Sequence, residues 1–152
     1  MQKKDKNKII ILGIGNIGRQ DDGLGWLFLD FLKEEGTANT DIEYRYQLQI
    51  EDAELICHYN KVIFVDATKN NTTNGFSFEV CKPSGKFSFS THALVPETIL
   101  FLANKLYQHN PKAFVLGIQG YQWNLKNGLT IKANYNFDKA KAYFNEKISV
   151  DI

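Results

Sequence analysis

Two carboxylates and one imidazole, those of Asp22, Asp66 and His92, stand where they could support metal chemistry. Asp22 lies in the loop after an apolar run, Asp66 ends another apolar run, and His92 precedes a predicted helix. A mixed set of oxygen and nitrogen ligands with open positions suits nickel, zinc or cadmium better than magnesium or calcium. The carboxyl ends of parallel strands meet at one edge of a sheet, and the three residues therefore predict a metal site there.

Each of these acids, and the histidine, also has an ordinary structural interpretation. Asp21 or Asp22 could cap a helix that begins near Leu24, and for Asp21 we favour this role. Asp66 could close its strand through an Asx turn. His92 could be a buried histidine that bonds to the backbone. The residues taken singly therefore leave both interpretations open.

The segment 13–25 holds the most specific pattern of the chain. Gly13 to Gly18 matches the G-x-G-x-x-G of dinucleotide-binding proteins, in which a helix N-terminus beside the third glycine holds a pyrophosphate. Here Gln20-Asp21-Asp22-Gly23 follows instead, and its two carboxylates would repel a pyrophosphate. A nucleotide-binding module is therefore the disfavoured alternative. The residues to which we assign a motif or backbone role are Gly13, Gly15, Asn16, Asp21 and Gly23.

Length and charge limit the class of protein. With 152 residues, we expect one domain over 1–152, of which residues 1–7 form a flexible basic tail. The net charge of +1 gives no electrostatic reason to expect nucleic acid as a partner. No apolar run reaches the length of a membrane span, and the N-terminal stretch lacks the pattern of a signal peptide. We therefore expect a cytoplasmic protein without a membrane partner.

The hydrophobic periodicity predicts a three-layer α/β/α fold, with a mostly parallel doubly wound sheet of about five strands and one antiparallel edge strand. Strands are predicted over 8–13, 42–48, 61–66, 76–81 (the edge strand) and 113–119. Helices are predicted over 24–35 with a cap at Gly36, over 51–59, from Pro96 onward, and over 138–148 with Asp138 near its start. The segment 120–136 is predicted to be a long loop.

Four blocks of the sequence, in order, extend over nearly the whole chain. They are Gly13-Ile-Gly-Asn with Asp21-Asp-Gly-Leu-Gly, Phe64-Val-Asp-Ala, Ser90-Thr-His-Ala-Leu with Pro96-Glu, and Leu116-Gly-Ile-Gln with Gly128-Leu-Thr. In residues, order and spacing these blocks closely resemble the hydrogenase maturation endopeptidases, which trim the large subunit of nickel-iron hydrogenases.

The resemblance implies a function and a site. It implies an endopeptidase, with no classical nucleophile, that removes the C-terminal extension of a hydrogenase large-subunit precursor after nickel insertion. The family's metal-binding and catalytic residues match Asp22, Asp66 and His92. Nickel would be presented by the substrate, and zinc or cadmium could take its place in crystals.

Two stretches depart from the family pattern. In many relatives the corresponding stretches carry acidic residues or proline. This chain has instead Gly120 to Trp123 in the first stretch and Lys132-Ala133-Asn134 in the second. Tyr121 and Trp123 are candidates for contact with the large subunit or for core packing. A peptidyl-tRNA hydrolase, which also opens with a strand and Gly-x-Gly-Asn, is a weaker alternative. That family uses an early histidine, whereas the first histidine here is His58.

Overall fold

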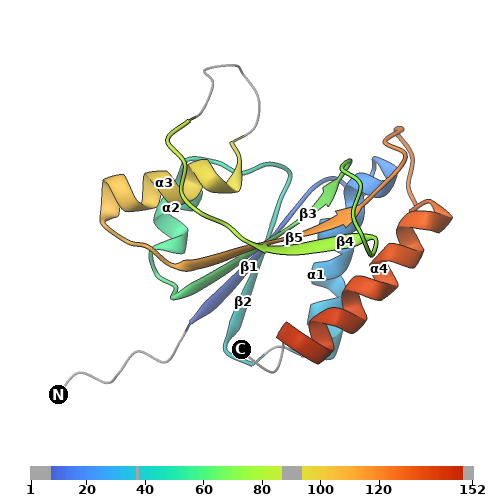
Figure 1. The fold of residues 1–152 in the computed structure, drawn as a ribbon, viewed down its shortest axis with the longest axis horizontal. Helices are drawn as coiled ribbons and strands as arrows, with labels where there is room; N and C mark the ends of the chain where they lie inside the picture. The colour runs from blue at the N-terminus through green and yellow to red at the C-terminus, as the bar shows by residue number, and fades with distance from the viewer. Residues whose placement is uncertain (1–7, 37, 87–93, 149–152) are drawn as a thin grey trace.

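A computed structural model describes residues 8–36, 38–86 and 94–148 of this chain. Five strands form one sheet in the order β2-β1-β3-β5-β4, and only β4, at the edge, runs antiparallel to its neighbour (Figure 1). The strands are β1 (Ile9–Ile14), β2 (Thr40–Arg45), β3 (Lys61–Thr68), β4 (Phe76–Val80) and β5 (Lys112–Gln119). This arrangement confirms the predicted sheet, including its antiparallel edge strand.

Helices cover both faces of the sheet, which confirms the predicted three-layer α/β/α fold (Figure 1). One face carries α1 (Leu24–Glu35) and α4 (Ile131–Tyr143), which continues into the π-helical turn η2 (Phe144–Ile148). The other face carries α2 (Glu51–Ile56) and α3 (Pro96–Tyr107). No helix in the described ranges has the length and apolar character needed to span a bilayer.

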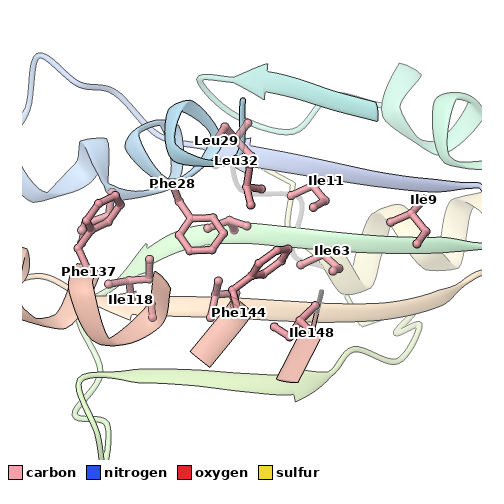
Figure 2. Close-up of a cluster of buried hydrophobic side chains, with 14 of the residues drawn as sticks. Ile9, Ile11, Phe28, Leu29, Leu32, Ile63, Ile118, Phe137, Phe144 and Ile148 are labelled. Atoms are coloured by element: carbon pink, nitrogen blue, oxygen red, sulfur yellow. The ribbon is translucent and has the colours of Figure 1, made fainter. Parts of the chain in front are cut away.

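The sheet separates two hydrophobic clusters. Side chains alternate along β1, so that Ile11 packs on the α1 and α4 side while Leu12 packs on the α2 and α3 side. Figure 2 shows the first cluster, in which the Phe28 ring lies 5.4 Å from that of Phe144 and 6.3 Å from that of Phe137. Burial of one such ring contributes about 1.5–3 kcal/mol, and the cluster therefore holds α1 and α4 firmly against the sheet.

Local signals predicted several helix ends correctly. α1 has the predicted bounds, and Gly36 ends it with a positive φ of 75° and a backbone hydrogen bond to Leu32 of 3.0 Å. Pro96 occupies the first position of α3, as expected. Two elements are shorter than predicted, because β2 ends at Arg45 and α2 ends at Ile56.

The predicted start of the last helix was wrong, although its helical structure ends at Ile148 as predicted. α4 begins at Ile131, so the long loop ends at Thr130 and Asp138 lies in mid-helix, 3.0 Å from Lys141. Thr130 is the N-cap, and its hydroxyl oxygen accepts a hydrogen bond of 3.2 Å from the Ala133 backbone amide. Asn136, which the prediction placed at the end of the loop, is a polar side chain on the buried face of the helix.

Candidate functional site

Asp22 and Asp66 lie close together at the carboxyl edge of the sheet. Asp22 belongs to η1 (Gln20–Gly23), a 3-10 turn between β1 and α1, and Asp66 lies near the end of β3. The charge of Asp22 raises the pKa of Asp66, which requires the two carboxylates to be near one another. The third predicted ligand, His92, lies outside the described residues, and its role stays a prediction.

The electrostatics of this pair are unfavourable without a cation. Burial, reinforced by the negative charge of Asp22, raises the pKa of Asp66 to about 7. Burial also raises the pKa of Asp22, although the positive charges of Arg19 and Lys69 and a backbone hydrogen bond from Asn16 oppose this rise. A divalent cation would offset both negative charges. The pair is therefore suited to bind a metal ion or a cationic group.

The motif glycine Gly15 and the motif residue Asn16 shape the turn that presents Asp22. Gly15 has a φ of 143°, and a Cβ there would lie 2.0 Å from the carbonyl oxygen of Asp22. The Asn16 backbone amide donates to that same oxygen at 3.0 Å. The Asn16 side-chain oxygen accepts from the Gly18 amide at 2.8 Å. Both residues thus hold η1 folded back over the end of β1, a geometry that a side chain on Gly15 would prevent.

Close backbone contacts bury the first turn of α1. A Cβ on Gly25 would lie 2.5 Å from the carbonyl oxygen of Ile14, and one on Gly13 would lie 2.8 Å from that of Gly25. A Cβ on Gly23 would lie 2.9 Å from the Cα of Ile17. These contacts pack the N-terminus of α1 closely against the chain's own backbone. The Leu24 amide at this end already donates to the Asp21 carbonyl oxygen, and two carboxylates lie in the turn just before it, which disfavours a bound pyrophosphate.

The predicted helix cap at Asp21 was wrong, because no side chain caps α1. The fully buried Asp21 carboxylate instead accepts hydrogen bonds from the distant loop 120–130. Its donors are the backbone amides of Tyr121 at 2.7 Å, Gln122 at 3.1 Å and Thr130 at 2.8 Å, and the Thr130 hydroxyl at 2.8 Å. Asp21 therefore holds this loop against the turn that carries Asp22.

The two candidate contact residues of this loop have different surroundings. The Tyr121 side chain is 40% exposed, and its hydroxyl oxygen accepts from the Asn136 amide at 2.9 Å. Trp123 is half-buried, and the Lys69 ammonium lies 5.2 Å from its ring centre. Trp123 thus packs beside a residue that influences Asp22, whereas the more exposed Tyr121 ring has the Lys132 ammonium 5.5 Å from its centre. Contact of either residue with a substrate stays a prediction.

Sequence reasoning missed Thr130 and Lys69 as parts of the site. Thr130 both caps α4 and bonds to Asp21, while Lys69 lowers the pKa of Asp22 from the loop after β3. Thr130 and Asp21 are 109 positions apart. A local sequence pattern cannot predict a contact between residues so far apart. Lys69, in contrast, lies three positions after Asp66, and this proximity in sequence could have identified it as part of the site.

Solved structures of hydrogenase maturation proteases share this fold. The NiFe hydrogenase maturation protease HycI from Thermococcus kodakarensis is 22% identical, with a TM-score of 0.67 and 93% of each chain covered. The hydrogenase maturating endopeptidase HybD from E. coli is 18% identical, with a TM-score of 0.64, covering 92% of this chain and 94% of that one. A hydrogenase 2 maturation peptidase from a Thaumarchaeota archaeon is 17% identical, with a TM-score of 0.62 and coverages of 91% and 97%.

These likenesses extend over most of each chain and confirm the fold that the resemblance implied. No protein-family model matches the chain, and no curated protein matches it significantly. At identities of 17–22% the likeness establishes a common fold, while the reaction has to be argued from the site.

Proposed function

We propose that this chain is an endopeptidase that removes the C-terminal extension from the large-subunit precursor of a nickel-iron hydrogenase after nickel insertion. One observation carries the proposal: the electrostatically coupled pair of Asp22 and Asp66 stands at the carboxyl edge of the sheet. The sheet belongs to a fold shared with hydrogenase maturation proteases.

The nickel ion in this scheme is part of the substrate. Asp22 and Asp66 would bind it through carboxylate oxygens, and His92 is the third ligand that the resemblance adds. Borderline divalent ions accept such a mixture of oxygen and nitrogen ligands. The ion, held between precursor and enzyme, would place the scissile peptide bond and either polarise its carbonyl group or acidify a bound water.

Exposed apolar side chains near the site support a large protein as the substrate. They belong to the turn after β1, the stretch after β2, and the loop and first helical turn after β5, all of which leave the carboxyl edge of the sheet. Apolar surface of this kind marks contacts with macromolecules more than sites for small polar ligands. The residues are Ile17, Tyr46, Ile50, Tyr121, Leu125 and Ile131.

The same electrostatics would let the enzyme distinguish precursor with nickel from precursor without it. Binding of a nickel-free precursor would leave Asp22 and Asp66 desolvated with no cation between them. Burial of uncompensated charge is strongly unfavourable, so this complex would be weak. Processing would therefore follow nickel insertion and not precede it.

The decisive experiment incubates the purified protein with the nickel-loaded and the nickel-free large-subunit precursor of the same organism. Mass spectrometry then measures whether a C-terminal peptide is lost. We expect loss from the loaded precursor alone, and no loss with the Asp22→Asn or His92→Ala variant. Asp138→Asn is the matched control, because it makes the same change as Asp22→Asn on an exposed part of α4.

Two results would contradict the proposal. Equal cleavage of both precursors would rule out the nickel requirement. Failure to cleave either precursor, under conditions in which both are folded, would rule out the proteolytic function. Normal cleavage by His92→Ala would remove that residue from the site.

A further inference from the structure

The outer edge of β4 presents backbone groups with no strand beside them. Two backbone hydrogen bonds flank the β4–β5 ladder. One runs from the Gln119 amide to the Gly75 oxygen at 2.9 Å, and the other from the Cys81 amide to the Ala113 oxygen at 2.8 Å. In an antiparallel pair every second residue turns its N–H and C=O toward the partner, so Ser77 and Glu79 also face β5. The backbone groups of Phe76, Phe78 and Val80 therefore point outward, where no other strand of the described ranges pairs with them.

A cavity of about 510 Å³ follows this outer edge. Phe76 and Phe78 line it from the α4 side of the sheet, and Ser77 and Glu79 line it from the opposite side. Because residues of both faces contribute, the cavity runs along the edge of the strand and not over one face. Its remaining wall is Tyr143 and the polar stretch from Thr68 through 70–74, which reads Asn-Asn-Thr-Thr-Asn.

The polar wall of the cavity is anchored. The Gln119 side-chain oxygen accepts hydrogen bonds from the Thr72 backbone amide at 2.9 Å and from the Thr72 hydroxyl at 2.8 Å. The Gln119 amide nitrogen donates to the Asn71 side chain at 3.4 Å. The neutral amide and hydroxyl groups of 70–74 can both donate and accept hydrogen bonds. Such groups suit a peptide backbone better than a charged ligand.

The cavity lies in register with the carboxylate pair. Asp66 on β3 is paired with Gly117 on β5, and Gly117 is paired in turn with Ser77 on β4. Residues in register point to the same face of a sheet, and neighbouring strands are about 4.8 Å apart. Asp66 and Ser77 thus stand about 10 Å apart across a glycine that has no side chain. A chain in extended conformation spans this distance with about three residues.

We propose that the outer edge of β4 and its adjoining cavity form a peptide subsite, in which the C-terminal extension of the precursor adds as a strand beside β4. The inference rests on the proposed function, because it identifies the occupant as the segment that follows the scissile bond. Strand addition to an open sheet edge is a recurring mode of peptide recognition, in which backbone hydrogen bonds supply the affinity.

The geometry also assigns a direction to the bound segment. β4 runs antiparallel to β5, so its first residue, Phe76, is the end nearest the carboxyl edge. An extension that leaves the site near Asp66 therefore enters at Phe76 and runs parallel to β4 toward Val80. Backbone pairing of this kind tolerates many side chains, and the enzyme would hold extensions of differing sequence.

Amide hydrogen exchange tests the subsite without reference to cleavage. In the free protein we expect Phe76, Phe78 and Val80 to exchange fast, and Ser77 and Glu79 to exchange slowly. The first probe is a synthetic peptide with the sequence of the precursor's C-terminal extension. A second probe is the capped strand-forming hexapeptide Thr-Val-Thr-Val-Thr-Val. At saturating peptide the three outward amides should exchange at least about tenfold more slowly, while those of Ser77 and Glu79 change little.

A kinetic test uses the exposed Val80, whose side chain is 65% accessible. Proline is tolerated at an edge-strand position whose N–H faces outward, so Val80→Pro removes one peptide-binding donor and keeps the β5 ladder. KM for the loaded precursor should rise about three- to tenfold, with kcat unchanged. Val80→Ala, which keeps the donor, should leave both parameters as they are.

The outcomes separate this inference from the proposed function. Protection of the outward amides by the extension peptide supports the subsite whether or not the precursor is cleaved. Protection by the hexapeptide alone shows that the edge binds peptides but overturns the extension as its occupant. No protection by either probe overturns the subsite, even if the precursor is processed. Exchange on the unaltered protein decides the matter should Val80→Pro fail to fold.

Discussion

Asp21 and Asp66 are two acidic residues at the same edge of the sheet with opposite surroundings. The Asp21 carboxylate is fully buried and accepts four hydrogen bonds. The Asp66 side chain is half-buried and lies near the negative charge of Asp22, and only the Ala67 backbone amide favours its ionised form. One acid is stabilised by its neighbours and the other is not.

This difference separates a structural carboxylate from one that we propose to be functional. Four hydrogen bonds, three on Oδ2 and one on Oδ1, already stabilise the Asp21 carboxylate, which serves to hold the loop 120–130. Asp66 retains its capacity to bind a cation because the fold leaves it poorly compensated. Perturbed carboxylates of this kind gather at functional sites. Asp22 adjoins Asp21 in the sequence yet belongs with Asp66 in its chemistry.

The largest effect should follow from Asp66→Asn. Loss of the carboxylate removes a proposed metal ligand, and cleavage of the loaded precursor should fall about 1000-fold or more. The folded state should be no less stable, since the repulsion with Asp22 is relieved. Precursor cleavage and urea unfolding measure the two quantities. A variant that cleaves normally would show that Asp66 is not a ligand.

Asp21→Asn should have the reverse profile. The Tyr121 backbone amide donates to one carboxylate oxygen of Asp21 and the Thr130 backbone amide donates to the other. Whichever oxygen is replaced by the asparagine NH2 group, this group would therefore face a backbone N–H that has lost its acceptor. The free energy of unfolding should drop by about 3 kcal/mol in urea titrations. Asp22→Asn is the matched control and should cost little or nothing. Equal losses in both variants would erase the distinction between the two acids.

The metal-free protein should lose stability as the pH rises from about 4 to about 8 because of Asp66. Its pKa is about 7 in the folded state against an ordinary value of 3.8, so the native state holds the extra proton in this window. The full shift corresponds to about 4 kcal/mol, and solvent screening at this partly exposed side chain reduces the expected loss to about 2 kcal/mol. Urea unfolding at several pH values measures it, and Asp66→Asn should flatten the curve. The raised pKa of Asp66 would be refuted if the unfolding free energy of the unaltered protein, compared with that of Asp66→Asn, increased between about pH 4 and about pH 8.

The smallest effect is expected at Thr130. Thr130→Val removes the cap of α4 and one donor to Asp21, and should cost about 1–2 kcal/mol of unfolding free energy. Thr130→Ser keeps the hydroxyl and should restore most of that loss. If the two variants were equally destabilised, the methyl group of Thr130 and not its hydroxyl would matter.

The sequence by itself determined the features that depend on neighbouring residues. Alternation and apolar runs predicted all five strands, Gly36 and Pro96 predicted helix ends, and the spacing of the acids placed Asp22 and Asp66 at strand ends. Periodicity, caps and backbone conformation act over a few positions, and such signals can therefore be read directly from the chain.

Only the tertiary structure decided the roles of individual polar residues. The four bonds of Asp21 reach donors at least 100 positions away, so nothing beside it in the sequence distinguishes it from Asp22. Asn136, the last residue of the predicted loop, lies on the buried side of α4, where its amide donates to the Gln119 backbone oxygen at 3.0 Å and to the Tyr121 hydroxyl. A polar side chain is stable in a buried position only where the fold brings it a partner, and the fold alone supplies that partner.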